Sequence, residues 1–284
     1  MNILPKKSFT IEVDDVKYAL DAGGNPWLEY SLAMHAYASV GLPAMPFEPL
    51  ALYLNDEYLG YYNLVELYNE DLNDVYNSKG ELFKIELWDF AKDYPIQGES
   101  EKKFPSNNDF GSLSRLLTNC ANMEKEEWVS WIEENTDMEN IARYMVVRDY
   151  FGVPDTSRLN FYIYFSPKAV ILPWDNDRGY TYSDVGGNNL FTERMLESDE
   201  FREIYTTLFQ KYFFDDRPDN TEYLIDDLQV YLDNLKELLE PSTQSDPAWF
   251  LEYSAFVEEY DSIVKFFADR GDEILASDAW TGLL

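Results

Sequence analysis

The sequence is poor in the residues that several kinds of functional site require. It contains one cysteine, Cys120, so no disulfide can form within the chain. It contains one histidine, His35, which excludes zinc sites built from clustered histidines and makes any Ser-His-Asp triad depend on that residue alone. Residues 32–38 form an apolar stretch typical of a packed helix, so we interpret His35 as a packing residue.

Long apolar runs and basic residues are also scarce. No stretch of about 18 apolar residues is present, and the N-terminus has no apolar signal-peptide core, so we expect no membrane span and see no export signal. The 22 basic residues are outnumbered by 54 acidic ones, which gives a formal net charge of −32. Such a surface repels nucleic-acid backbones and anionic lipids, whereas basic polypeptides and divalent cations are suitable partners. The acidic residues are spread along the chain, so most of them are expected simply to be solvated.

The sequence does contain enough apolar material for a substantial core. Apolar residues make up 45% and aromatic residues 17% of the 284 residues, which favours one two-lobed unit over 1–284. In the first 90 residues, alternating patterns predict strands, a longer helix spans 27–40 and a short one spans 69–77. The predicted strands are residues 8–20 with a turn at Asp14-Asp15, 50–54, 58–66 and 81–87.

The spacing of apolar residues changes after a polar stretch over residues 91–110. We interpret this stretch as a linker or loop. Beyond it, apolar spacing of three and four predicts helices, interrupted by a strand pair at 160–165 and 169–173. The predicted helices are residues 111–120, 124–134, 137–151, 199–214, 219–240 and 247–276. We therefore predict an α+β fold with a strand-rich N-lobe (1–90), a mostly helical C-lobe (111–284) and a cleft between them.

The segment from 149 to 180 carries the most specific chemistry. Asp155 follows a predicted helix, Asn160 opens a strand, and the next strand ends in Asp175-Asn176-Asp177-Arg178-Gly179. If the two strands are adjacent, their tips bring together the oxygens of Asp155, Asn160, Asp175 and Asp177. Carboxylate and amide oxygens are the hard ligands that Mg²⁺ prefers. The segment therefore predicts a magnesium site.

The spacing of these residues also indicates phosphoryl transfer. Protein kinases carry Asp-x-x-x-x-Asn in the catalytic loop and a metal-binding Asp-x-Gly after a later strand. Here Asp155 and Asn160 have the first spacing, and Asp177-Arg178-Gly179 has the second form. Turn and capping residues, or a calcium loop, are the alternatives. An EF-hand is discounted because Tyr180 and Gly186 stand where glycine and glutamate are required.

A phosphate-binding cation is expected beside such a site. Lys84 lies between apolar residues in a predicted strand, and Lys7 opens another, so either lysine is a candidate. The alternative for each is an ordinary edge-strand lysine. Glu66, the last residue of the predicted strand 58–66, is interpreted either as a hinge residue or as a solvated carboxylate.

Several segments together resemble the spore coat protein H (CotH) kinase family, over residues 5–185 and in the family's order. They are Pro5-Lys6-Lys7-Ser8-Phe9, a strand-turn-strand from Leu52 to Tyr62 containing Asn55-Asp56-Glu57-Tyr58, Glu66, Leu82-Phe83-Lys84, residues 155–164 ending in Asn160-Phe161-Tyr162-Ile163-Tyr164, and Pro173-Trp174-Asp175-Asn176-Asp177. The last is the most distinctive of these motifs.

The resemblance implies a protein-kinase-like fold that binds ATP with Mg²⁺ and phosphorylates Ser-rich proteins. It implies a catalytic role for Asp155 and metal ligation by Asn160, Asp175 and Asp177. It implies that Lys7 or Lys84 is the lysine that binds phosphate, and Glu66 and Trp174 are further candidates for binding the nucleotide. The family usually has an Arg-Gly-Asn-Ser-like segment before the opening strand, where this chain has Met1, which predicts weakened ATP binding or activity.

Three functions follow as hypotheses. The first is an atypical kinase that transfers the ATP γ-phosphate to Ser or Thr of a basic or Ser-rich protein. The second is a non-catalytic spore-coat or cell-surface module that retains the fold. The third is a kinase for a sugar or another small molecule. The family is largely secreted or spore-associated, and the sequence leaves localisation open.

Overall fold

The computed structural model describes residues 6–14, 16–22, 28–45, 47–85, 100–154, 160–176, 179–215, 217, 219–245 and 253–284. Its strands are β1 (Phe9–Val13), β2 (Val16–Asp21), β3 (Phe47–Leu54), β4 (Glu57–Glu66), β5 (Glu81–Ile85), β6 (Glu101–Phe104), β7 (Phe161–Phe165) and β8 (Ala169–Pro173). Its helices are α1 (Glu29–Ser39), α2 (Leu72–Val75), α3 (Gly111–Asn122), α4 (Lys125–Asn135), α5 (Met138–Phe151), α6 (Leu190–Met195), α7 (Asp199–Phe209) with a π-helical continuation (Gln210–Phe214), α8 (Ile225–Ser245), α9 (Tyr253–Leu275) and α10 (Asp278–Thr281).

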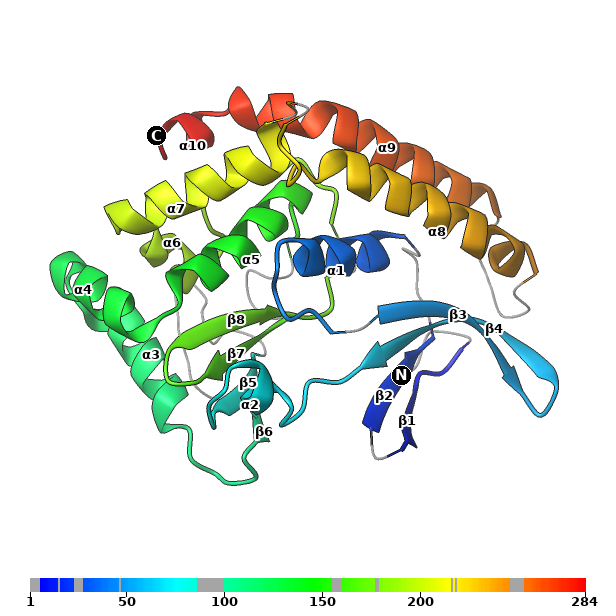
Figure 1. Ribbon diagram of the computed structural model, residues 1–284, viewed down its shortest axis with the longest axis horizontal. Coiled ribbons are helices and arrows are strands. Elements are labelled where there is room, and N and C mark those ends of the chain that lie inside the picture. The colour runs from blue at the N-terminus through cyan, green and yellow to red at the C-terminus, as the bar shows by residue number, and fades with distance from the viewer. Residues whose placement is uncertain are drawn as a thin grey trace.

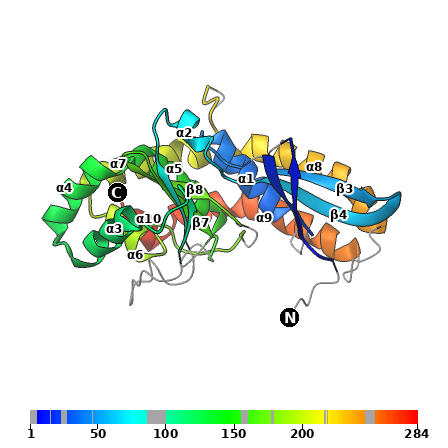
Figure 2. The same cartoon turned by 90° about the horizontal axis from the view of Figure 1, so that it is seen from below.

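The first sheet has the strand order β1-β2-β4-β3 and consists of two hairpins. Asn55 and Asp56 both have positive φ, 51° and 66°, which is the backbone of the tight turn predicted between β3 and β4. The 8–20 strand with its turn is likewise a hairpin, β1 and β2. Figure 2 shows this sheet on one side of the molecule, with α1 between it and the second sheet.

The second sheet has the order β6-β5-β7-β8. We expected residues 81–87 among the N-terminal strands, but β5 pairs with β7 and so lies in the second sheet. The physical reason is that Leu82, Phe83 and Ile85 are all buried, and a strand that is apolar on both faces requires a central position.

Strand β6 falls inside the stretch that was predicted to be a linker. Lys102 of β6 forms an ion pair with Glu81 of β5 and donates to the Asn107 side chain at 2.8 Å. A strand held by polar contacts of this kind has no hydrophobic periodicity, so hydropathy cannot reveal it.

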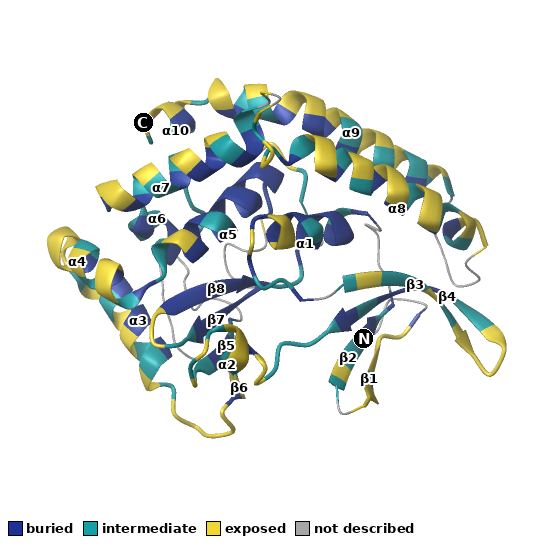
Figure 3. Cartoon of the chain, in the orientation of Figure 1, coloured by how far each residue is buried: buried dark blue, intermediate teal, exposed yellow. Residues whose placement is uncertain are grey.

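Helix α5 forms the centre of the C-terminal part. It packs against β8, α1 and α7, and most of its residues are buried. Asp137 caps its N-terminus by accepting a hydrogen bond from Asn140 N at 3.0 Å, and Gly152 ends it in the left-handed conformation, φ 63°. Figure 3 shows the buried residues concentrated in α5, β7 and β8, whereas the outer faces of α8 and α9 are exposed.

Helix α8 of the C-terminal part packs against β4 and α1 of the N-terminal part (Figure 1). It therefore connects the two parts of the chain. His35 of α1 lies at this contact, half-buried. Its Nε2 lies 3.1 Å from Asp227 Oδ2, and its ring stacks on Tyr231 at 3.9 Å between centroids. These contacts agree with a packing role for His35. The predicted α+β class, with a strand-rich N-terminal part and a mostly helical C-terminal part, is confirmed.

None of the described helices is long and apolar enough to cross a membrane.

Cys120 gives a test of the packing of α3. Burial raises the pKa of its thiol from 9.0 to about 12, so the folded protein keeps this proton at a pH where the unfolded chain loses it. The resulting stability is present below pH 9 and is lost as the pH rises from 9 toward 12. Between pH 8 and pH 10, we expect wild type to lose about 1.4 kcal/mol of unfolding free energy relative to Cys120→Ala. Urea denaturation of both proteins measures the difference, and an unchanged difference contradicts the buried thiol.

Candidate nucleotide and metal site

The pairing of β7 with β8 brings two of the predicted site residues together. Phe161 at the start of β7 lies opposite Pro173 at the end of β8, so the residues just outside this pair are neighbours. The side-chain nitrogen Nδ2 of Asn160 donates to the carbonyl oxygen of Asp175 at 2.9 Å. Both residues have positive φ, 67° and 51°, a conformation that Asn and Asp adopt more readily than most residues.

This hydrogen bond also orients the amide group of Asn160. Its nitrogen faces the Asp175 carbonyl, so its oxygen Oδ1 points away from that carbonyl and keeps its capacity as an acceptor. Asn160 is buried, and Asp175 is half-buried. Amide and carboxylate oxygens at one sheet end fit a hard divalent cation.

The other two acidic residues of the predicted site, Asp155 and Asp177, lie outside the described residues. Within the part of the chain that the structure describes, no group of three or more His, Cys, Asp and Glu side chains lies close enough to hold a metal ion. The described portion of the predicted metal site is therefore Asn160 and Asp175.

Lys84 lies at the same end of the second sheet. It is opposite Tyr162 in the β5–β7 register, two residues from Asn160 along the chain. Its ammonium lies 5.7 Å from the ring centroid of Trp174, the residue that precedes Asp175. Trp174 in turn packs edge-on against Tyr162, also at 5.7 Å. The cation–π contact holds a positive charge beside the turn that carries Asp175.

Lys7 has a different position. It precedes β1 of the first sheet, and its side chain is exposed. Its neighbour Lys6 is the buried lysine, with Nζ donating to Tyr61 O at 2.7 Å and lying 5.1 Å from the Tyr62 ring centroid. The pair Lys6-Lys7 carries no pattern that separates the buried member from the exposed one, so sequence reasoning missed Lys6.

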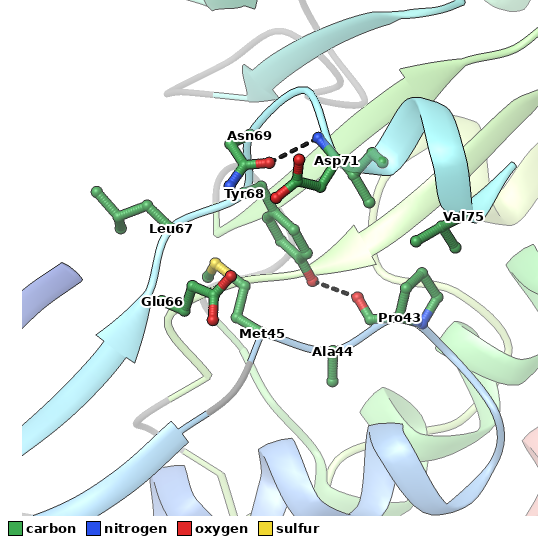
Figure 4. A pocket seen from close by; sticks show the side chains of 10 residues that line it. Pro43, Ala44, Met45, Glu66, Leu67, Tyr68, Asn69, Asp71 and Val75 are labelled. Carbon is green, nitrogen blue, oxygen red and sulfur yellow. Dashed lines mark hydrogen bonds between the residues drawn. The ribbon is translucent and has the colours of Figure 1, made fainter. Parts of the chain in front are cut away.

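Glu66 lies at the end of β4 and lines a cavity of about 150 Å³ beside the connection between the two sheets (Figure 4). Tyr68 also lines this cavity. Its hydroxyl lies 2.8 Å from Pro43 O and 3.2 Å from Pro173 O, so its single proton is shared between two acceptors. Its ring packs edge-on against Tyr162 at 5.2 Å. Tyr68 therefore connects the Glu66 cavity with the end of β8.

Two further residues hold the turn after β8 and were not singled out from the sequence. Asn176 is fully buried; its Oδ1 accepts from Tyr37 of α1 at 3.0 Å, and its Nδ2 donates to Trp174 O at 2.6 Å. Glu29, in the first turn of α1, accepts from Gly179 N at 3.1 Å. The signal for Asn176 was its place between two Asp residues, whereas Glu29 is an unremarkable acidic residue in a helix first turn.

Comparison with known proteins identifies the family. The family model described as CotH kinase protein matches residues 2–274, which confirms the resemblance drawn from the motifs. No curated protein matches the sequence. Among solved structures, the proinflammatory kinase CtkA of Helicobacter pylori is similar at a TM-score of 0.38 and 11% identity, covering 98% of this chain and 91% of that one.

The contact between Asn160 and Asp175 is tested by Asn160→Ala. The variant loses a buried hydrogen bond and places alanine in the left-handed region, so we expect its unfolding free energy to fall by about 2–3 kcal/mol. Asn77→Ala is the matched control, because Asn77 also has positive φ, 47°, but is exposed. It should lose only the conformational term, about 1 kcal/mol. Urea denaturation compares the two, and equal losses would show that the hydrogen bond contributes nothing.

Proposed function

We propose that this chain, which belongs to the CotH kinase protein family, binds ATP with Mg²⁺ at the Asn160–Asp175 end of the second sheet and transfers the γ-phosphate to a Ser or Thr hydroxyl of a protein. The observation that supports this most is the meeting of three groups there. Asn160 contacts Asp175 at the end of the β7–β8 pair, and the ammonium of Lys84 lies over the ring of Trp174, the residue that precedes Asp175. Metal-bound phosphates need both oxygen donors and a cation.

Each residue has a proposed role. Asn160 and Asp175 hold the metal together with Asp177, and Lys84 contacts the phosphate oxygens. Asp155 accepts the proton of the attacking hydroxyl. When bound, Mg²⁺ neutralises negative charge on the β- and γ-phosphate oxygens. Trp174 helps to position the Lys84 ammonium, which is carried on a flexible four-carbon stem.

We also propose the division into lobes in a modified form. The first sheet and α1 form the N-lobe, and the second sheet with α3 to α10 forms the C-lobe. Glu66, Tyr68 and the cavity between them lie at the connection. The nucleotide base is proposed to lie toward this connection, because Tyr68 links it through Tyr162 to Trp174.

The proposed acceptor is a basic, Ser-rich protein. The net charge of −32 steers basic polypeptides toward the surface and slows the approach of anionic ones. A small-molecule acceptor would gain little from this field, so the charge favours a protein substrate over a sugar.

Substitutions distinguish which of Lys84 and Lys7 contacts the phosphate. Lys84→Met removes a charge-assisted contact with phosphate, so we expect the Kd for Mg·ATP to rise about tenfold to a hundredfold. Lys7→Met, on the first sheet, should change the Kd by less than about threefold. Lys79→Met, exposed in the turn before β5, is the matched control. Calorimetric titration gives the three constants, and a larger effect of Lys7→Met would move the phosphate to the first sheet.

Substitutions also distinguish the proposed roles of Asp155 and Asp177. Asp177→Asn should abolish the Mg²⁺ dependence of ATP binding. Asp155→Asn should retain binding but lower the rate of autophosphorylation by about 10²–10⁴-fold, the range for loss of a general base. Calorimetry and phosphate incorporation measure the two effects.

ATP binding and phosphate transfer by the wild-type protein distinguish the three candidate functions. If it neither binds ATP nor incorporates phosphate, the kinase proposal fails and a non-catalytic module is the better description. If Asp177→Asn binds Mg·ATP as tightly as wild type, the metal assignment is wrong. A sugar or free serine that outcompetes basic proteins as acceptor would identify a small-molecule kinase.

A further inference from the structure

A fully buried arginine on α9 caps the end of the central helix α5. The Nε of Arg270 donates to the carbonyl oxygen of Tyr150 at 2.9 Å, and its Nη2 donates to that of Asp149 at 2.8 Å. The last carbonyls of a helix have no partner within the helix, so these bonds satisfy groups that burial would otherwise leave unpaired. A cation at this end also complements the helix dipole.

The same guanidinium reaches a second segment of the chain. Its Nη2 donates to the carbonyl oxygen of Ser183 at 2.6 Å, so Arg270 ties the end of α5 to the segment that follows β8. The two segments also touch directly, because Thr181 N donates to Phe151 O at 3.2 Å. Gly152 allows this approach, since a Cβ at its position would overlap the Thr181 carbonyl oxygen.

The opposite side of the helix end is held by Asp149 and Arg148. The Asp149 carboxylate accepts from Arg148 Nε at 2.8 Å, from Tyr205 OH at 2.6 Å and from Gly186 N at 3.1 Å. Arg148 Nη1 donates to the Asn188 side chain at 2.7 Å. Buried charges tolerate this environment only when they are paired and hydrogen-bonded, as these are. The segment 183–188 is thus fastened to α5 by both arginines.

The fastened segments are the ones that flank the proposed metal and catalytic residues. Gly152 stands three residues before Asp155, and Thr181 stands four residues after Asp177. Further back along the same turn, Asn176 and Gly179 are bound to α1. The distance between the two segments therefore depends on contacts made by residues outside the proposed set of metal and catalytic residues.

We propose that Arg270 is a positioning residue for Mg·ATP binding, because its guanidinium fixes the separation of residues 149–152 and 181–183. This inference rests on the proposed function. Metal ligation is sensitive to shifts of about 1 Å in its supporting groups. Lysine cannot replace arginine here, since one ammonium does not reproduce a planar fork that reaches three carbonyl oxygens.

The test is Arg270→Lys, with Arg194→Lys as the matched control. Arg194 also caps a helix end, donating to Cys120 O at 2.5 Å and Met123 O at 2.9 Å. Like Arg270 with Glu273, it pairs with a glutamate three residues on, Glu197. Both variants should lose stability. Only Arg270→Lys should raise the Mg²⁺ concentration for half-maximal ATP binding, by about tenfold, a change that lost stability alone does not produce in the folded protein.

A second variant perturbs the same contact from the other side. Gly152→Ala pushes the helix end away from Thr181 and should raise the Mg²⁺ requirement as Arg270→Lys does. Its matched control is Gly41→Ala, which has the same left-handed backbone, φ 83°, but meets only the end of the Arg143 side chain. If Arg270→Lys fails to fold, this pair still decides the proposal.

Amide hydrogen exchange separates this inference from the proposed function. In Arg270→Lys, the amides of residues 179–187 should exchange at least about tenfold faster, whereas in Arg194→Lys they should not change. If wild type binds no Mg·ATP, the proposed function fails, while the exchange result still reports whether Arg270 fastens the two segments. Unchanged exchange, or an equal rise in Mg²⁺ requirement in both arginine variants, would overturn the positioning role.

Discussion

The antiparallel pairing of β7 with β8 is the constraint on which the candidate site depends. Phe161 and Pro173 face each other at the end of this ladder, so the residues before β7 and after β8 leave the sheet side by side. Five residue pairs, from Phe161 opposite Pro173 to Phe165 opposite Ala169, set the register between two strands that are buried on both faces. The contact between Asn160 and Asp175 inherits this precision from a sheet that packs on α5.

The site is then supported from three directions by elements far apart in the chain. Helix α1 contributes Tyr37 and Glu29 to the turn after β8, β5 contributes Lys84 beside Trp174, and α9 contributes Arg270 to the end of α5. Each of these contacts is polar and lies in or beside a buried region. A polar contact that excludes water is costly to leave half-made, so these groups hold one arrangement more firmly than apolar packing alone would.

The sequence predicted most of the elements because their signals are local. The short apolar runs of β7 and β8, the helical spacing of α5 and the turn at Asn55-Asp56 are all present within a few residues. The convergence of Asn160 with Asp175 was also predictable, because it required only that two consecutive strands pair. What could not be predicted is long-range. The place of β5 in the second sheet, the burial of Lys6 rather than Lys7 and the role of Arg270 depend on partners that are more than 50 residues away.

The scarcity of basic residues gives the few that exist a particular importance. Arg148, Arg270 and Lys6 are buried and are used to tie segments of the chain together. Arg148 pairs with Asp149 and Arg270 with Glu273, and all three cations are buried, so they add little positive charge to an exposed surface whose net charge is strongly negative. Such a field attracts Mg²⁺ and repels free ATP, and the repulsion is screened only beyond about 8–10 Å at ordinary salt. Under the proposed function, a nucleotide therefore approaches with its charge already reduced by the metal, and Lys84 acts on it at contact distance. This makes the geometry around Asp175, rather than the overall charge, the property that decides whether phosphate can be held.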